Sequence, residues 1–280
     1  MADHGTGAGN RRAGPRVPPA MDGPNPISVG LSVLKARRVA RPRPGHRAGD
    51  PSHAALAGIL EAVRAHGVAA LSGRLDELDT YARTLAETRP DDLSPDGALA
   101  YWLNLYNAGA LTLAGEAVAT RQQSVLRLPG AFTREFVTVA GESLSLNDVE
   151  HGKIRRFRDP RIHAALVCGS ASCPTLRFEP YVGERLEGQL DDQIRSFLAA
   201  GGSVIEDDVL KLSRVFLWYG ADFVHPDRMP TILPAPRRRV ASALRTWLPN
   251  DQQDWLRSGC RRIAFQPYDW SLACSVRKPV

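Results

Sequence analysis

The sequence has few cysteines and no long apolar run, and these absences exclude whole classes of protein. Four cysteines in 280 residues are too few for a disulfide-stapled extracellular scaffold. No run reaches the roughly 18 apolar residues that a membrane-spanning helix needs, so we expect no membrane span. Internal repeats and a glycine-rich phosphate-binding loop are also missing. The ordinary contents of apolar (43%) and charged (24%) residues indicate a globular protein.

A basic excess is absent from most of the chain, although the formal net charge is +6. Residues 1–50 hold nine Lys/Arg and three Asp, which is the whole excess, and residues 51–280 hold 27 groups of each sign. A neutral folded region gives no reason to expect nucleic acid as a partner. The expected partner is therefore a small-molecule or peptide substrate of unknown identity.

The N-terminal segment is rich in residues that hinder folding, since residues 1–50 contain eight Gly and seven Pro. We therefore predict a disordered tail over residues 1–49 and a single globular domain over residues 50–280. The tail arginines are interpreted as solvated, with a membrane or nucleic-acid tether as the alternative. No export signal is recognisable, so a cytoplasmic location is expected unless a mis-assigned start codon hides such a signal.

Hydrophobic periodicity predicts a mixture of helices and short strands. Predicted helices cover residues 56–63, 75–87, 96–120, 181–200, 216–223, 240–247 and 251–258, with a further short helix from Asn147 or Asp148. Predicted strands cover residues 136–139, 143–146, 162–167, 204–205, 209–212 and 262–265. Hairpin signals outnumber parallel crossovers, so we predict an α+β fold with a small, mostly antiparallel sheet flanked by helices. The helix at 96–120 is apolar nearly all round and should be central and buried.

Two asparagines interrupt that apolar helix. Asn104 and Asn107 lie three residues apart, and buried amides need hydrogen-bond partners. They either pin neighbouring loops or position a substrate, and the sequence leaves both readings open.

A carboxylate and two histidines follow. Glu150 directly precedes His151, and His163 begins the predicted strand at 162–167. A carboxylate can orient an imidazole and hold one tautomer, so either histidine is a candidate base. The alternatives are structural: each histidine makes only hydrogen bonds that hold the core or the surface, and Glu150 forms an ion pair with a nearby arginine.

The segment from Cys168 to Pro174 has a cysteine at each end of a turn of small residues. Pro174 fits the first turn of a helix, which would place Cys173 at a helix N-terminus and lower the pKa of its thiol. Cys168 continues an apolar strand and is interpreted as buried. The two cysteines are also spaced to permit a disulfide. A zinc site with His151 and His163 lacks a matching second cysteine pair, so no metal or other cofactor is expected.

Six segments, in a fixed order along the chain, carry a resemblance to a known family. They are Tyr101-Trp102-Leu103-Asn104-Leu105-Tyr106-Asn107, Ser145-Leu146-Asn147-Asp148-Val149-Glu150-His151-Gly152, Asp159-Pro160-Arg161-Ile162-His163 through Cys168, Ser172-Cys173-Pro174, Trp218-Tyr219-Gly220-Ala221-Asp222-Phe223 and Tyr268-Asp269-Trp270-Ser271-Leu272. From about residue 95 to 272 the chain resembles the domain of unknown function 547 family. The resemblance implies an uncharacterised protein, expected to be bacterial, with no assigned activity. One departure is Thr175, because the family usually reads Cys-Pro-Pro at Cys173-Pro174-Thr175.

The leading hypothesis is a thiol-dependent hydrolase or acyl transferase acting on an amide, peptide or thioester. Cys173 is the candidate nucleophile, His163 the base and Glu150 the group that orients it, with His151 as the rival base. Substrate-positioning roles fall to Asn104, Asn107 and Cys168. The His-before-Cys order suggests a papain-like hydrolase only by analogy of fold. The alternatives are a dithiol redox protein that uses Cys168 and Cys173, and an interaction domain without catalysis.

Overall fold

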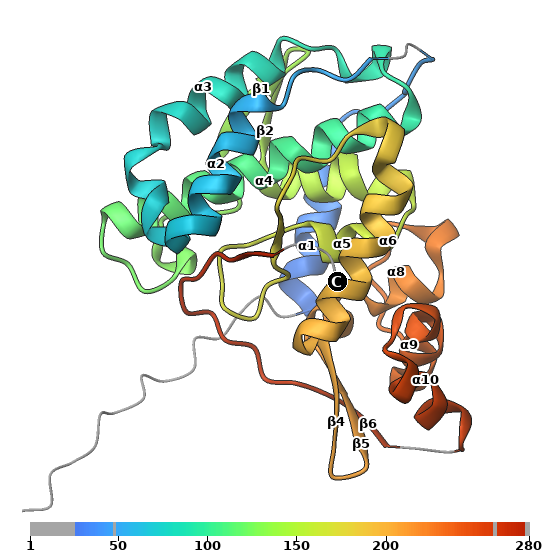
Figure 1. The fold of residues 1–280 in the computed structure, drawn as a ribbon. Coiled ribbons are helices and arrows are strands. Elements are labelled where there is room, and N and C mark those ends of the chain that lie inside the picture. Colours follow the sequence, from blue (N-terminus) through green and yellow to red (C-terminus); the bar gives the residue numbers. More distant parts are fainter. Residues whose placement is uncertain (1–25, 47–48, 260–261, 278–280) are drawn as a thin grey trace, which may run out of the picture.

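A long buried helix organises the fold, as Figure 1 shows. The computed structural model describes residues 26–46, 49–259 and 262–277. Helix α4 (Pro95–Ala119) runs through the middle. On one side lie α2 (Ala54–His66) and α3 (Leu75–Ala86), and on the other lie the short α5 (Ile162–Ala165) and α6 (Leu186–Phe197). The predicted central buried helix is confirmed.

Local sequence explains where α4 begins and how closely it packs. The hydroxyl of Ser94 accepts a hydrogen bond from the backbone N–H of Gly97 at 3.1 Å, and Pro95 occupies the first turn. At Gly115 a β-carbon would lie 2.9 Å from the carbonyl oxygen of Leu71. Only glycine at position 115 therefore allows the 3₁₀-helical segment Gly67–Gly73, which follows α2, to approach α4 this closely.

The strands form small separate sheets. Strands β1 (Glu135–Val139) and β2 (Glu142–Ser145) form an antiparallel hairpin, as do β4 (Ser203–Glu206) and β5 (Val209–Leu212). Strand β6 (Arg262–Phe265) adds to β5 in parallel, and β3 (Leu176–Arg177) pairs in parallel with β7 (Val276–Arg277). The α+β prediction is confirmed, although the strands described are distributed over three small sheets rather than one flanked sheet.

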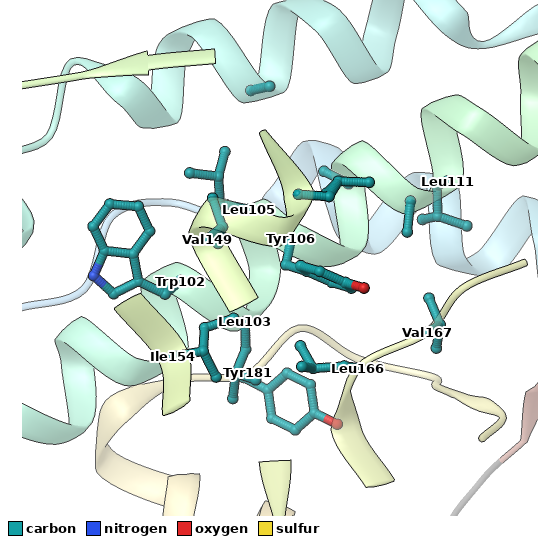
Figure 2. Close-up of a cluster of buried hydrophobic side chains, with 14 of the residues drawn as sticks. Trp102, Leu103, Leu105, Tyr106, Leu111, Val149, Ile154, Leu166, Val167 and Tyr181 are labelled. Atoms are coloured by element: carbon teal, nitrogen blue, oxygen red, sulfur yellow. The ribbon is translucent and has the colours of Figure 1, made fainter. Parts of the chain in front are cut away.

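The remaining helices are α1 (Pro26–Lys35), α7 (Val215–Trp218), α8 (Gly220–Val224), α9 (Arg237–Leu244) and α10 (Asn250–Arg257), together with a π-helical turn at Asp148–Lys153. The buried apolar side chains form two clusters. The larger cluster surrounds α4, and Figure 2 shows part of it. A second cluster forms where α6, α7, α8 and α9 meet β5, with Phe216 at its centre.

The predicted disordered tail is too long. Residues 1–25 lie outside the described residues, but α1 falls within the segment predicted to be disordered. Val33, Ala36 and Val39 from this segment are buried. Composition over the 50-residue window hid a short apolar stretch that docks on the rest of the fold. The described structure therefore begins at Pro26 rather than near residue 50.

The strand predicted at residues 162–167 is also wrong, because Ile162–Ala165 is one turn of α-helix. The Asp159 side chain accepts a hydrogen bond from the backbone N–H of Arg161 at 2.9 Å and starts this turn. A short apolar run does not distinguish a buried strand from a buried helix. Only the segment from Leu166 onward is extended.

One helical stretch, Ala54–Gly73, is long and apolar enough by length and composition to cross a membrane. Leu56, Ile59 and Val63 of this stretch are buried in the core. A core helix of a globular protein passes the same test, so the stretch does not indicate a membrane span.

Candidate functional site

The segment that carries Cys168 and Cys173 is held by the C-terminal part of the chain. Gly169 adopts a φ of +74°, which turns the backbone directly after Cys168. The backbone N–H of Ala171 donates to the carbonyl of Ser271 at 2.9 Å, and that of Ala273 donates to Gly169 at 3.1 Å. These bonds bring Tyr268 and Cys274 to the cysteine turn.

Cys168 and Cys173 are in direct contact as free thiols. The backbone N–H of Cys168 donates to the sulfur of Cys173 at 2.8 Å. The sulfur of Cys168 lies 3.0 Å from the hydroxyl of Ser170 and 3.2 Å from that of Tyr268. Both cysteines are half-buried as residues, and Cys173 packs against the edge of the larger core cluster.

This environment shifts the pKa values of the two thiols in opposite directions. Hydrogen bonds from the Cys173 thiol, Ser170 and Tyr268 outweigh burial and lower the pKa of Cys168 to about 7. Burial and the adjacent Cys168 raise the pKa of Cys173 well above its usual range. The opposite directions of the two shifts favour the thiolate on Cys168 and the protonated thiol on Cys173.

The predicted helix after Cys173 does not exist. Pro174 and Thr175 lie in no helix and lead into β3, which pairs with β7. No helix dipole acts on Cys173, and the low thiol pKa belongs to Cys168 instead. Cys168 does not continue a strand either, because residues 166–168 have no regular secondary structure; as a whole residue Cys168 is half-buried.

The candidate base His163 lies in a buried ionic network. Its Nε2 is 2.9 Å from a carboxylate oxygen of Asp222, and its ring stacks on Tyr219 at 4.1 Å. Arg155 donates to both oxygens of Asp222, at 2.8 and 3.0 Å. Burial opposes ionisation of Asp222, but His163 and Arg155 outweigh it and hold the carboxyl pKa well below its usual range.

Glu150 and His151 join the same network from the π-helical turn. The hydroxyl of Tyr106 donates to Glu150 at 3.2 Å, and Nδ1 of His151 lies 3.5 Å from the other Glu150 oxygen. Arg155 approaches the same Nδ1 at 3.3 Å. Burial lowers the pKa of His151 to about 4 although Glu150 opposes it, so His151 is neutral at pH 7.

Tyr106 lies between this network and the thiols. Burial raises the pKa of Tyr106, and the charges of Glu150, Cys168 and Cys173 raise it further. Figure 2 shows its ring in one cluster with Leu166 and Val167, which lead to Cys168. Within the described residues, no hydrogen bond joins Cys173 to His151 or His163. The sulfur of Cys173 contacts the N–H of Cys168 and, at 4.0 Å, the carbonyl of Leu166. The catalytic roles predicted for Cys173, His163, Glu150 and His151 stay predictions.

The two asparagines bond to backbone. Asn104 donates to the carbonyl of Tyr181 at 2.7 Å and accepts from its N–H at 3.0 Å. Asn107 donates to the carbonyl of Ala165 at 3.0 Å and accepts from the N–H of Val167 at 3.2 Å. These contacts support the loop-pinning interpretation, and Asn107 fixes the segment that leads directly to Cys168.

We expect Asn107→Ala to lower the free energy of unfolding by about 2–3 kcal/mol, because it leaves a buried carbonyl and a buried N–H without partners. Urea denaturation followed by circular dichroism measures this loss. The substitution Asn147→Ala, which removes a half-buried amide bonded to the Ser32 hydroxyl, should cost less than half as much. Equal losses for the two variants would show that the paired hydrogen bonds of Asn107 stabilise the fold no more than the single bond of Asn147 does.

Several residues of the site could not be recognised from sequence. Tyr268 lies 100 residues from Cys168, and no local pattern marks it as a partner of that thiol. Arg155 was detectable in principle, because it follows His151 by one helical turn. Within the described ranges, no group of three or more His, Cys, Asp or Glu side chains has the arrangement of a metal site.

The comparisons with known proteins bear on the central segment. Residues 90–198 match the DUF547 family model. Its description is "Protein of unknown function, DUF547", so the match carries no activity. It confirms the family resemblance over that segment, which includes Glu150, His163 and both cysteines of the turn. The DUF547 segment does not include Asp222 or Tyr268. No curated protein and no solved structure matches the chain.

Proposed function

We propose that the protein carries out thiol–disulfide exchange with Cys168 and Cys173 as the reacting pair. The observation that supports it is the contact between the two thiols, in which the sulfur of Cys173 also accepts a hydrogen bond from the backbone N–H of Cys168 at 2.8 Å. A vicinal dithiol with one thiol ionised at neutral pH is the arrangement that exchange requires. The substrate class is a disulfide of a small molecule or a peptide.

The chemistry takes two steps. The Cys168 thiolate attacks one sulfur of the substrate disulfide, so a mixed disulfide forms and the first substrate thiolate leaves with a proton from solvent. The Cys173 thiol then loses its proton and attacks the Cys168 sulfur, which releases the second substrate thiol. The substrate is reduced to two thiols while the cysteine pair is oxidised to one disulfide.

The surroundings of Cys168 fit the first step. The hydroxyls of Ser170 and Tyr268 stabilise the attacking thiolate. Tyr268 also packs against Trp218 and Trp270, with ring centroids 4.9 and 4.5 Å away. Trp270 is buried, so the half-buried rings of Trp218 and Tyr268 are the part of this cluster that offers apolar surface to a substrate next to the reacting sulfur.

A hydrolase or acyl transferase is the second candidate, and one observation favours it. Tyr106 donates a hydrogen bond to Glu150, and the charges of both thiols raise the pKa of its hydroxyl, which supports an acid–base role for the Tyr106–Glu150 pair near the thiols. The role of base would then fall to the Glu150–Tyr106 pair rather than to His163, whose Nε2 is held by Asp222.

Trapping of the mixed disulfide tests the proposed exchange. With glutathione disulfide, Cys173→Ser should accumulate a glutathione adduct on Cys168, because the resolving thiol is missing. The wild type should instead form the intramolecular disulfide, as read by mass spectrometry of peptides. The matched control Cys274→Ser should behave as the wild type, since burial raises the pKa of Cys274 to about 12.

Two results would contradict the exchange proposal. One is a Cys173→Ser protein that forms no adduct on Cys168 under conditions that modify small thiols. The other is turnover of a thioester by wild type that survives in neither cysteine variant, which would favour the acyl transferase.

A further inference from the structure

A cavity far from the cysteine turn in sequence has an unusual excess of positive charge. It has a volume of about 630 Å³ and lies between the end of α1 and the loop at residues 227–233. Five arginines line it, and Asp227 is the one carboxylate among its lining residues. The arginines are Arg37, Arg41, Arg156, Arg158 and Arg228.

The described residues supply these arginines with few partners. No ion pair within the described part of the chain involves any of the five. The Nε of Arg156 is buried without a hydrogen-bond partner. Burial and the charges of Arg41 and Arg37 lower the pKa of Arg156, so the arginines repel one another. A cluster of this kind is stabilised by an anion that several guanidinium groups share.

Exposed apolar side chains surround the same cavity. In the described residues, the exposed large hydrophobic side chains all fall in two segments: Ile27 (74% exposed), Leu31 (54%) and Leu34 (47%) in α1, and Ile232 (48%) and Leu233 (68%) in the loop. The first three are spaced by four and three residues, so they share one face of α1. A β-carbon at Gly30 would lie 3.9 Å from Ile232, so the helix and the loop form one continuous surface.

We propose that this surface binds an anionic phospholipid membrane peripherally, with a lipid phosphate in the arginine-lined cavity and the apolar side chains inserted at the headgroup boundary. An amphipathic helix with basic residues beside protruding apolar side chains is the usual arrangement for interfacial binding. Leu34, Ile232 and Leu233 line the cavity beside the arginines, and the exposed Ile27 and Leu31 extend the apolar surface along α1. Apolar and anion-binding groups therefore adjoin here as they must at a phospholipid headgroup boundary. Residues 1–25 hold three Arg and two Asp, so the chain's own N-terminus lacks the negative charge to fill the site.

Vesicle co-sedimentation tests this proposal with the full chain. We expect the protein to bind vesicles of phosphatidylcholine with phosphatidylglycerol and not vesicles of phosphatidylcholine alone. The triple variant R37Q/R41Q/R156Q should lose about 100-fold in affinity. A control with the same change in net charge, R64Q/R83Q/R121Q, replaces exposed arginines on α2, α3 and the turn after α4 and should bind as the wild type does.

A second variant separates lipid from other anions. Leu31→Ser with Leu233→Ser removes exposed side chains, so it should fold normally and still lose vesicle binding. Inorganic phosphate, poly-glutamate or a DNA duplex should each compete weakly. Vesicle binding that survives the loss of both leucines, or a polymer that binds more tightly than the vesicles, would overturn the membrane assignment. The first result would mean that the arginines bind lipid phosphates without insertion of the apolar side chains, and the second would leave an acidic protein or nucleic acid as the partner. Equal binding to both kinds of vesicle would also overturn the assignment.

Discussion

Iodoacetamide should alkylate Cys168 at least about 100-fold faster than Cys274 at pH 7, even after allowance for the lower intrinsic nucleophilicity of a low-pKa thiolate. The reason is the difference in pKa between the two thiols, about 7 for Cys168 and about 12 for Cys274. The thiolate of Cys168 forms as the pH rises through its pKa. Its labelling rate should therefore rise with a midpoint near pH 7 and level off about one pH unit above that midpoint.

Timed alkylation followed by peptide mapping measures both the rates and the pH profile. Tyr268→Phe is the matched variant, because it removes one hydroxyl from the Cys168 sulfur and keeps the aromatic packing. It should move the midpoint of the profile to higher pH. Fastest labelling at Cys173, or a profile that Tyr268→Phe leaves unchanged, would refute the assigned stabilisation of the Cys168 thiolate.

Asp222→Asn should lower the free energy of unfolding by about 3–5 kcal/mol, since it leaves Arg155 buried without its counter-charge. The side chains of Arg155 and Asp222 are 1% and 0% exposed. The substitution retains the shape of the side chain, so the loss reports charge rather than volume. The folded-state pKa of Asp222 is lowered, so its contribution is present above the unfolded pKa of about 3.9 and is lost as the pH falls below it.

Chemical denaturation at neutral and acidic pH measures this effect. The control is Asp79→Asn, which breaks the ion pair with Arg83, whose side chains are 61% and 71% exposed. Its loss should be less than about 1 kcal/mol. Similar losses for the two variants would show that the buried network does not stabilise the fold beyond an ordinary surface pair.

The helical part of the fold could be predicted from sequence because its signals are local. Pro95 and the long apolar run mark α4, and the spacing of Leu186, Leu190 and Ile194 marks α6. The error at residues 162–167 arose because a short apolar run fits two kinds of structure. The helix expected after Cys173 depended on a proline alone, and pairing of β3 with the distant β7 decided that region instead.

The sequence predicts which residues form the site but not which of their side chains contact one another. The sequence identifies Glu150, His151, His163 and both cysteines as side chains that could act as nucleophile, acid or base. It could not identify Asp222 as the partner of His163, nor Tyr268 as the partner of Cys168, because both contacts depend on the tertiary fold. The distribution of the thiol proton depends on these contacts. The sequence alone therefore favours a lowered thiol pKa at Cys173, whereas the contacts favour it at Cys168.

A redox titration of the wild-type protein tests the central claim most directly. The protein is equilibrated in glutathione buffers of graded potential, and the cysteine pairs are mapped by mass spectrometry. We expect Cys168 and Cys173 to convert together in one two-electron transition to an intramolecular disulfide, with Cys274 remaining a thiol. Independent oxidation of the two cysteines, with no disulfide between them at any potential, would contradict the claim that they act as a pair.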